Sequence, residues 1–361
     1  MSNRALACTL VGGYPVKATV FHEHGPPEVL KYEDFPDPDV GPNQVLVNVK
    51  AVALNHLDLF TRAGVPGLKL EMPHILGSDI SGVIKEVGSD VSGNLEVGQK
   101  VIIDPGRSCG SCEHCIRGEV SLCRDYGIIG EHYRGGYADF ISEKAEYVVP
   151  IPNHSKLDFN QSAAAPLTFM TAWRMLINKA KIKPGDDVLI IGIGGGVALA
   201  ALQIARFAGA RVLVTSSSDE KLDKALKLGA SFGINYRNSP DFHKEVWSLT
   251  NRRGVDVVVD SVGEATWAKS LRSLRKGGRL VTCGATSGPN VMINANLVFW
   301  NQLEILGSTM GSRSELREVL KLVWDGHLKP IVDQSFPLSK AEEAHRIMEK
   351  GDQFGKLVLN P

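Results

Sequence analysis

Four of the six cysteines lie within fifteen residues of one another: Cys109, Cys112, Cys115 and Cys123. Three closely spaced thiolates and a fourth a short loop away can close a tetrahedron around Zn²⁺. Four thiolates leave no coordination position open, so the sequence predicts one structural zinc per chain that does not touch substrate. An iron–sulfur cluster is the rival. Its bacterial spacing has three residues before a Cys-Pro pair, whereas here seven residues separate the last two cysteines and Arg124 follows.

A glycine-rich string is the second chemical feature. Residues 192–198 read Gly-Ile-Gly-Gly-Gly-Val-Ala. Such glycines let the backbone approach a pyrophosphate, and the N-terminus of a following helix supplies free N–H donors. We predict dinucleotide contacts at Gly194, Gly195, Gly196 and Val197. A plain tight turn would contain the same glycines, but an apolar strand before it and a helix after it favour a binding turn.

The residues at the end of the next expected strand indicate whether the cofactor is NAD(H) or NADP(H). An NAD site normally places Asp or Glu there for the ribose 2′-hydroxyl. Here Ser216 and Ser217 stand instead, Lys221 follows with a positive charge, and no carboxylate comes before Asp219. The pattern favours NADP(H) over NAD(H). The serines could also serve only as the cap of a helix expected over residues 220–228, and both roles are compatible.

Two kinds of element must position these features. Between residues 17 and 166, short β-branched runs alternate with turn residues, as at 45–50, 82–87 and 100–103, which predicts an all-β unit, a small barrel. From 168 to 309, apolar strands at 187–191, 211–214, 255–260 and 278–282 alternate with crossover segments, including a helix over 197–208. Strand–crossover–strand repetition predicts a doubly wound parallel sheet, and therefore an α/β fold class.

The C-terminal part is expected to form helices over residues 315–323 and 340–349 and a strand over 355–359, which could return to the first domain. Residues 1–16 are interpreted as an extension. Cys8 and Cys283 are isolated, and we expect Cys283, in an apolar strand, to be a core residue.

The balance of charges excludes some classes of partner. Lys+Arg and Asp+Glu both number 40, so no basic excess supports nucleic-acid or anionic-membrane binding. No stretch approaches the length of a membrane span, and the first sixteen residues lack the long apolar core of a secretory signal. We therefore expect a cytoplasmic protein that acts on a small-molecule substrate, without nucleic acid or membrane.

Together, the cysteine spacing, the barrel-like first half and the glycine turn resemble the medium-chain alcohol dehydrogenase and quinone oxidoreductase superfamily. The resemblance covers residues 17–361. It implies a GroES-like catalytic domain at 17–167 plus 312–361, a Rossmann NADP-binding domain at 168–311, and an active-site cleft between them. It also implies a homodimer or homotetramer, with a dimer strand at residues 302–308.

The same resemblance locates the positions of a catalytic zinc. Zinc-dependent members bind it through Cys, His and Cys, and the matching positions here are Asn55, Ser78 and Leu167. Leu cannot coordinate a metal and Asn cannot replace a thiolate, so the resemblance points to the zinc-free quinone and enoyl reductases. It also implies cofactor contacts at Thr171, Ser217, Lys221 and Tyr236, and a contact of Lys356 with the pyrophosphate.

Without a Lewis acid, an alkoxide is difficult to form, whereas hydride addition to a conjugated C=C or a quinone gives an anion that hydrogen-bond donors can stabilise. The expected donors are Asn55, His56 and His132, although His56 could instead contact cofactor phosphates and His132 could be an ordinary loop residue. Asp58 and Asp79 could orient these groups or only hold barrel turns.

Three functions follow. The first is a zinc-free, NADP(H)-dependent reductase of enones, enals or quinones. The second is an alcohol or aldehyde dehydrogenase, with an absent or non-standard catalytic metal such as one held by His56, Asp79 and Glu131. The third is a non-catalytic NADPH-binding protein, which would bind the cofactor without turnover. Metal content and an acceptor screen separate them.

Overall fold

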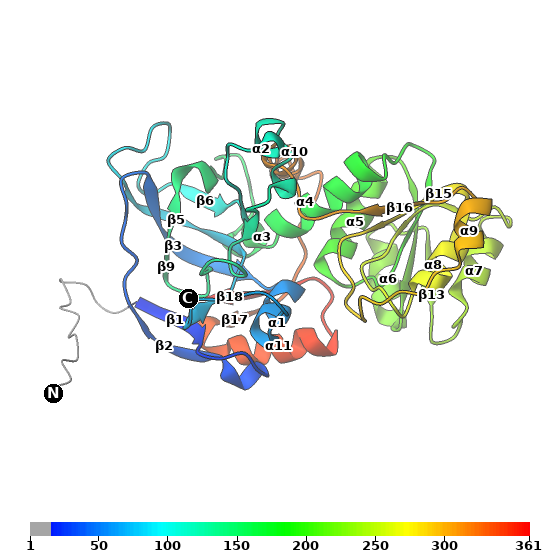
Figure 1. The fold of residues 1–361 in the computed structure, drawn as a ribbon, viewed down its shortest axis with the longest axis horizontal. Coiled ribbons are helices and arrows are strands. Elements are labelled where there is room, and N and C mark those ends of the chain that lie inside the picture. The colour runs from blue at the N-terminus through cyan, green and yellow to red at the C-terminus, as the bar shows by residue number, and fades with distance from the viewer. Residues whose placement is uncertain (1–15) are drawn as a thin grey trace.

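The computed structural model describes residues 16–361, which form two lobes side by side (Figure 1). The N-terminal lobe is built on antiparallel strands in which inward and outward side chains alternate. In β3 (Gln44–Ala53) the residues Val45, Val47 and Val49 are almost completely buried, while their neighbours are partly exposed. This period of two buries one face of the strand in the core of the lobe. The expected extension, residues 1–16, lies outside the described residues except for Val16.

The strands of this lobe form two main sheets. The smaller has the order β2 (Lys31–Phe35), β1 (Val16–Phe21), β4 (His74–Ile75). The larger has the order β10 (Val148–Pro150), β6 (Lys100–Ile103), β5 (Asp79–Val87), β3, β18 (Lys356–Asn360), β17 (Val332–Pro337), and β9 (Phe140–Lys144) also pairs with β3. A short pair, β7 (Gly106–Arg107) and β8 (Gly127–Ile128), flanks the cysteine segment.

The C-terminal strand returns to the first lobe, as expected. β18 pairs antiparallel with β3, with Val358 opposite Ala53, and the Leu54 amide donates to the Leu357 carbonyl at 2.9 Å. Figure 1 shows the C-terminal elements among the N-terminal strands of this lobe. This return brings Lys356, the first residue of β18, close to the segment that follows β3.

The second lobe contains a six-stranded parallel sheet, which confirms the doubly wound prediction. Its order is β13 (Phe232–Asn235), β12 (Arg211–Ser216), β11 (Asp187–Ile190), β14 (Val255–Val259), β15 (Leu274–Thr282), β16 (Glu304–Gly307). Every residue of β11 is buried, as expected for a strand covered on both faces. The helices of this lobe are α5 (Gly196–Phe207), α6 (Asp219–Lys227), α7 (Phe242–Leu249), α8 (Trp267–Ser273) and α9 (Ala295–Trp300).

The remaining helices belong to the first lobe or join the two. They are α1 (His56–Ala63), α2 (Glu113–Ile116), α3 (Phe159–Ala163), α4 (Pro166–Trp173), α10 (Arg313–Trp324) and α11 (Ala341–Lys350). The expected helix at 315–323 begins earlier because Ser312 and Glu315 form a capping box. The domain limit expected after residue 167 falls inside α4, and the one after 311 falls at the cap of α10.

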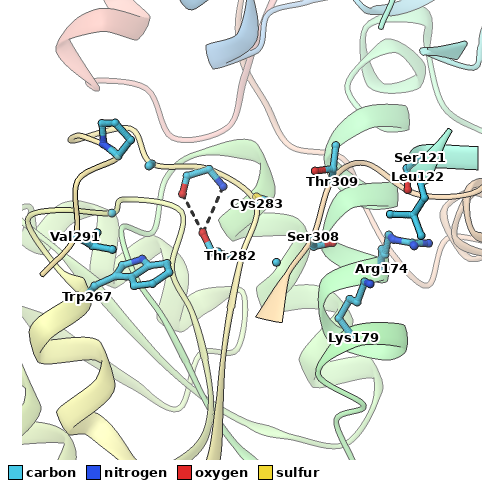
Figure 2. Close-up of a pocket in the computed structure, with 15 residues that line it drawn as sticks. Ser121, Leu122, Arg174, Lys179, Trp267, Thr282, Cys283, Val291, Ser308 and Thr309 are labelled. Atoms are coloured by element: carbon cyan, nitrogen blue, oxygen red, sulfur yellow. Dashed lines mark hydrogen bonds between the residues drawn. The ribbon is translucent and has the colours of Figure 1, made fainter. Parts of the chain in front are cut away.

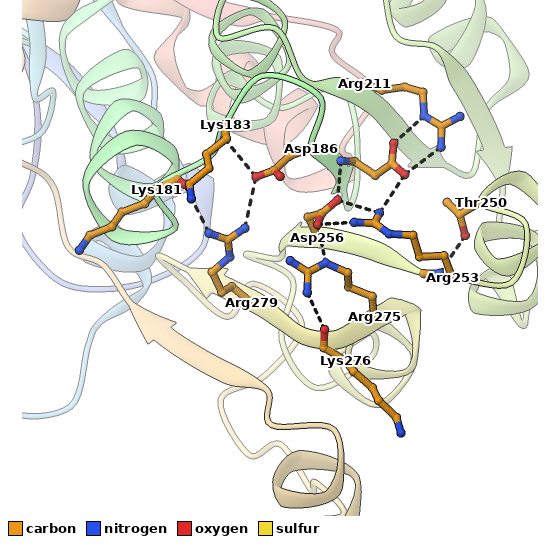
Figure 3. A network of polar contacts seen from close by, with 12 residues as sticks. Lys181, Lys183, Asp186, Arg211, Thr250, Arg253, Asp256, Arg275, Lys276 and Arg279 are labelled. Carbon is orange, nitrogen blue, oxygen red and sulfur yellow. Dashed lines mark hydrogen bonds and ion pairs between the residues drawn. The ribbon is translucent and has the colours of Figure 1, made fainter.

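A network of arginines and aspartates closes the amino-terminal edge of the parallel sheet (Figure 3). Asp256 accepts from Arg253 at 2.7 Å, from Arg275 at 2.5 Å and from the Asp187 amide at 2.9 Å. Burial alone would raise the pKa of Asp256, but the hydrogen bonds from Arg253 and Arg275 lower it to about 2. The network therefore ties the starts of neighbouring strands together at the edge opposite the glycine turn.

Among the helices described, none has the length and apolar character needed to cross a bilayer.

Candidate active site

A cavity of about 690 Å³ lies between the lobes. Both lobes contribute to its lining, through Asn55 and His56 on one side and the glycine turn on the other. A cleft of this size between two domains is typical of a cofactor and substrate site. The predicted site residues Asn55 and His56 line it. Every predicted cofactor-binding residue lines it as well: Thr171, Gly194, Gly195, Gly196, Val197, Ser216, Ser217, Lys221, Tyr236 and Lys356.

The glycine turn has the shape of a dinucleotide cradle. Gly194 has a φ of 136°, which strongly favours glycine, and its carbonyl accepts from the Gly355 amide at 2.9 Å. A Cβ atom added to Gly195, the N-cap of α5, would meet nothing within 4 Å, so this position opens into the cavity. A Cβ atom on Gly196 would lie 2.7 Å from Thr168 Cγ2 and 2.8 Å from Lys356 Cδ. The turn therefore offers the start of α5 to an anionic group, as the sequence predicts.

The end of β12 combines a helix cap with a cavity wall. Ser218 is the N-cap of α6, and its Oγ accepts from the Lys221 amide at 3.3 Å. Ser216 and Ser217 remain on the cavity side, together with Lys221 and Tyr236. No carboxylate of this segment is among the lining residues. The capping role and the lining role are thus divided between adjacent serines.

Two buried polar atoms in the described part of the cleft have no hydrogen-bond partner. They are Thr171 Oγ1 and Gln353 Oε1, and both residues line the cavity. Buried polar groups in folded proteins are normally hydrogen-bonded, so these two atoms are positioned for a bound molecule. Thr171 was predicted as a nicotinamide contact. Gln353 was not predicted, because a glutamine in a C-terminal loop carries no recognisable pattern.

At the floor of the cavity, three side chains form a closed polar group. Lys356 Nζ donates to Asn55 Oδ1 at 2.6 Å and to Asp79 Oδ2 at 3.0 Å. Asn55 Nδ2 donates to Asp79 Oδ2 at 3.0 Å and to the Ala53 carbonyl at 3.4 Å. The other oxygen of Asp79 accepts from the Leu167 amide at 2.7 Å. Asn55 and Lys356 line the cavity, whereas Asp79 is fully buried behind them.

Asp58 does not line the cavity, but it contacts Asn55, which does. Its Oδ2 accepts from the Asn55 amide at 2.7 Å and completes the capping box of α1, and its Oδ1 accepts from the Gly77 amide at 3.0 Å. Burial raises the pKa of Asp58 to about 7. Both oxygens accept from backbone amides, so Asp58 holds the turns at Asn55 and Gly77, and through the Asn55 amide it also fixes the position of Asn55.

The two predicted histidines lie in different places. His56, the first residue of α1, lines the cavity and is exposed in it; partial desolvation by the walls of the cleft, followed by the charge of Lys356, lowers its pKa. His132 is not a lining residue: its Nδ1 accepts from the Ile128 amide at 3.2 Å and lies 3.2 Å from Glu131 Oε2. Glu131 does line the cavity, and burial raises its pKa to about 7. The carboxyl group, and not the neighbouring imidazole, therefore faces the cleft.

The positions of the family's catalytic zinc ligands do not fit a zinc ion. Asn55 is committed to Lys356 and Asp79, the Ser78 hydroxyl is buried without a partner among the described residues, and Leu167 offers only a backbone amide to Asp79. Within residues 16–361, the metal-capable group that comes together is the cysteine cluster, not one formed by His56, Asp79 and Glu131.

The four cysteines have the geometry of a tetrahedral thiolate site. The sulfur atoms of Cys109, Cys112, Cys115 and Cys123 all lie within 4.8 Å of one another. The Cys112–Cys115 and Cys109–Cys123 pairs are 3.5 Å apart. Zn–S bonds of about 2.3 Å in a tetrahedron require sulfurs about 3.8 Å apart, so the cluster fits Zn²⁺. None of the four cysteines lines either cavity, so the cluster is separate from the polar group at the cleft floor.

A second cavity of about 430 Å³ continues from the first, and the two share Cys283, Gly284 and Thr309 (Figure 2). Arg174 and Lys179 stand on one side and Trp267 and Val291 on the other. Arg174 pairs with Glu119 and Glu315, whereas no hydrogen bond or ion pair to the Lys179 side chain occurs among the described residues. Cys283 was expected in the core of a strand; it instead follows β15 and lines both cavities, because the strand ends at Thr282.

Comparison with known proteins identifies the family. A model of the alcohol dehydrogenase GroES-like domain matches residues 41–153, and a model of the zinc-binding dehydrogenase matches residues 196–325. A zinc-type alcohol dehydrogenase-like protein of Schizosaccharomyces pombe is 34% identical over 91% of this chain and 94% of its own length. An acryloyl-coenzyme A reductase of Sulfurisphaera tokodaii is 30% identical over 93% and 98%.

A solved structure of an NAD-dependent alcohol dehydrogenase superimposes with a TM-score of 0.92 at 46% identity, covering 96% of this chain and 99% of that one. The two domain models together span more than half of the sequence. The chain therefore belongs to the zinc-type alcohol dehydrogenase family of medium-chain dehydrogenases/reductases, and it is an NAD(P)-dependent oxidoreductase.

Proposed function

We propose that the protein is an NADP(H)-dependent reductase of activated C=C bonds or quinones that works without a catalytic zinc. One observation carries the proposal: at the cleft floor, Asn55 stands at the first zinc-ligand position and is bonded to a lysine ammonium and a carboxylate. The similarity to an acryloyl-coenzyme A reductase supports it, because that name describes reduction of a C=C bond conjugated to a carbonyl.

The acceptor is inferred from what the cleft can stabilise. A bound nicotinamide supplies a hydride. Hydrogen-bond donors such as Lys356 and His56 can then hold the oxyanion that forms when a conjugated acceptor is reduced. Oxidation of an alcohol would require stabilisation of an alkoxide, which a metal normally provides and which these side chains provide less well.

The preference for NADP(H) rests on the end of β12. Ser216, Ser217 and Lys221 line the cavity there and offer hydrogen-bond donors and a positive charge to a 2′-phosphate. An Asp or Glu, which would bind the ribose hydroxyls of NAD and repel that phosphate, does not line this part of the cavity. Because a similar solved structure is named NAD-dependent, the ratio of the two affinities must be measured.

In this proposal, the acceptor binds in the second cavity. It adjoins the glycine-turn cavity at Cys283, and its Lys179, which has no ion pair among the described residues, lies opposite apolar Trp267 (Figure 2). This arrangement suits an acceptor with an apolar body and an anionic group. Unsaturated thioesters and acids therefore belong in the test panel beside simple enones, enals and quinones.

The test combines metal quantification of the purified protein with an NADPH-oxidation screen. One zinc per chain with turnover of enones, enals or quinones supports the proposal. Nearly two zincs per chain with alcohol oxidation would overturn it in favour of an alcohol dehydrogenase. Tight NADPH binding without turnover over the whole panel would identify a non-catalytic NADPH-binding protein.

A further inference from the structure

The ammonium of Lys356 has more donors than its protein neighbours use. Its side chain is 4% exposed and has two hydrogen-bond partners among the described residues, Asn55 Oδ1 and Asp79 Oδ2. A lysine ammonium carries three protons. Because Lys356 also lines the cavity, one N–H donor of this ammonium, which is ion-paired with Asp79, remains available at the cleft floor.

Asn55, which we expected to donate to the substrate, has no comparable donor left. One proton of its amide goes to Asp79 at 3.0 Å, and the Ala53 carbonyl lies 3.4 Å from the same nitrogen. Its oxygen is already accepting from Lys356. An amide in this arrangement can orient an ammonium, but the strong donor of the group is the lysine.

The stem of Lys356 fixes where this charge lies. Its backbone amide donates to the Ile331 carbonyl at 2.8 Å, which anchors the start of β18. Its Cδ lies close enough to Gly196 that a Cβ atom there would be 2.8 Å away. The side chain thus passes against the start of α5, where the dinucleotide turn begins, and ends at Asn55.

From these contacts we propose that Lys356 replaces the catalytic metal: its ammonium binds the carbonyl oxygen of the acceptor and stabilises the enolate, with Asn55 and Asp79 as positioning residues. The inference rests on the proposed function. A bound nicotinamide would supply the hydride, which bonds with its electron pair to the β-carbon. The π pair of the C=C bond then forms a double bond between the α-carbon and the carbonyl carbon, and the π pair of the C=O bond moves to the oxygen, so the acceptor is reduced and the cofactor would be oxidised. The α-carbon then takes a proton from water or from Glu131.

The competing role for Lys356 is a contact with the cofactor pyrophosphate, as the family resemblance implies. The two roles predict different defects. A pyrophosphate ligand contributes to cofactor affinity, whereas an oxyanion ligand contributes to the rate of hydride transfer after the cofactor has bound.

The experiment compares Lys356→Met with Lys356→Arg and with Lys221→Met, the other lysine of the cleft. NADPH affinity is measured by calorimetry, and hydride transfer to an enone by single-turnover absorbance at saturating NADPH. For Lys356→Met we expect a rate about 100–1000-fold lower and an NADPH Kd within about threefold of the wild type. Lys356→Arg keeps the charge and should recover part of the rate. Lys221→Met should instead raise the Kd.

Lys356→Met leaves the buried Asp79 without its cation and could prevent folding. The double variant Lys356→Met/Asp79→Asn removes both charges and keeps the experiment decisive, with circular dichroism as the check on folding. A raised NADPH Kd with an unchanged rate in either folded variant would assign Lys356 to the pyrophosphate and overturn the inference. If the wild type transfers no hydride to any acceptor, the proposed function itself fails, and this inference with it.

Discussion

The Nζ atom of Lys356 lies 2.6 Å from Oδ1 of Asn55, although 301 residues separate them in the chain. The contact exists because β18 pairs with β3 and the chain then passes directly from β3 to Asn55. It links the end of the sequence to the position where zinc-dependent relatives carry their first ligand. The pairing of β18 with β3 therefore brings these two residues together at the floor of the cleft.

Zinc content gives the first prediction. We expect one zinc per chain, and we expect Cys112→Ser to lose it, because three thiolates no longer complete the tetrahedron. The loss should lower the melting temperature by roughly 5–10 °C, since about 1 kcal/mol corresponds to ~2–4 °C in a chain of this size. Elemental analysis and calorimetry measure the two effects. Cys283→Ser is the control and should keep its zinc; a stable, zinc-free wild type would contradict the assignment.

Cofactor choice gives the second prediction. Ser217→Asp should raise the Kd of NADPH about 100-fold, because the carboxylate repels the 2′-phosphate, and should lower the Kd of NADH severalfold. Isothermal titration with both cofactors gives the ratio. The matched control is Ser218→Ala, which removes the cap of α6: it should cost about 1 kcal/mol of stability and leave the ratio unchanged. Equal ratios in wild type and Ser217→Asp would show that this serine is not part of the phosphate site.

Patterns within short stretches of sequence predicted the elements that are determined by neighbouring residues in the chain. The apolar run of β11 and the cysteine spacing identified the parallel sheet and the metal-type cluster. β17 was missed because its sequence, Val-Asp-Gln-Ser-Phe-Pro, is mostly polar, and β13 because it is only four residues long with a glycine inside. Both strands depend on neighbours that are distant in sequence.

Within the site, the sequence identified the residue types but not all of their partners. Asn55 and Asp79 were expected near the chemistry, and Lys356 was expected at the pyrophosphate, yet the structure joins all three. In the sequence, Glu131 was considered only as a possible ligand of a non-standard metal, and the fold shows that it lines the cavity while His132 does not. Such contacts arise from tertiary packing, which a single sequence does not encode in any periodic form.

Glu131 gives the third prediction, on pH. Burial raises the pKa of its carboxyl group to about 7, so the group is protonated below that pH and can supply the proton that the reduced acceptor needs. Enone reduction should therefore slow as the pH rises above about 7, and Glu131→Gln should remove this dependence and lower the rate. Steady-state kcat/KM between pH 5.5 and 9 tests it. The control, Glu96→Gln on an exposed loop, should keep the wild-type profile; a Glu131→Gln profile that still falls above pH 7 would assign the proton to another group.

The fourth prediction concerns assembly. β16 is the last strand of its sheet, and nearby Met292, Phe299 and Trp300 are 91%, 63% and 72% exposed. An open strand edge beside exposed apolar side chains fits a second copy of the chain. Sedimentation velocity should show a dimer or tetramer that Phe299→Glu dissociates, whereas Val97→Glu, at an exposed valine of the other lobe, should not. A monomeric wild type at micromolar concentration would contradict it.

The last prediction concerns stability and the aspartate network at the amino-terminal edge of the sheet. The pKa of Asp256 is about 2 in the folded chain, against an ordinary value of 3.8. Because the folded value is the lower one, the stabilisation is complete above about pH 4 and is lost as the pH falls towards 2. It corresponds to about 2 kcal/mol. Asp256→Asn should cost a similar amount at pH 7, about 2–3 kcal/mol, because Arg275 loses its carboxylate and Arg253 keeps only the longer pair with Asp187.

Urea unfolding at pH 7 and at pH 3 measures both effects. Since the network lies at the opposite edge of the sheet from the glycine turn, NADPH affinity at 25 °C should stay within about twofold in the folded Asp256→Asn variant. The control is Asp241→Asn, whose ion pair with Lys244 is exposed to solvent and contributes little to stability. If the two variants lose equal stability at pH 7, or if Asp256→Asn retains the full wild-type loss of stability between pH 7 and pH 3, the buried carboxylate does not organise this edge of the sheet. The stability of the sheet then rests on its apolar strands alone.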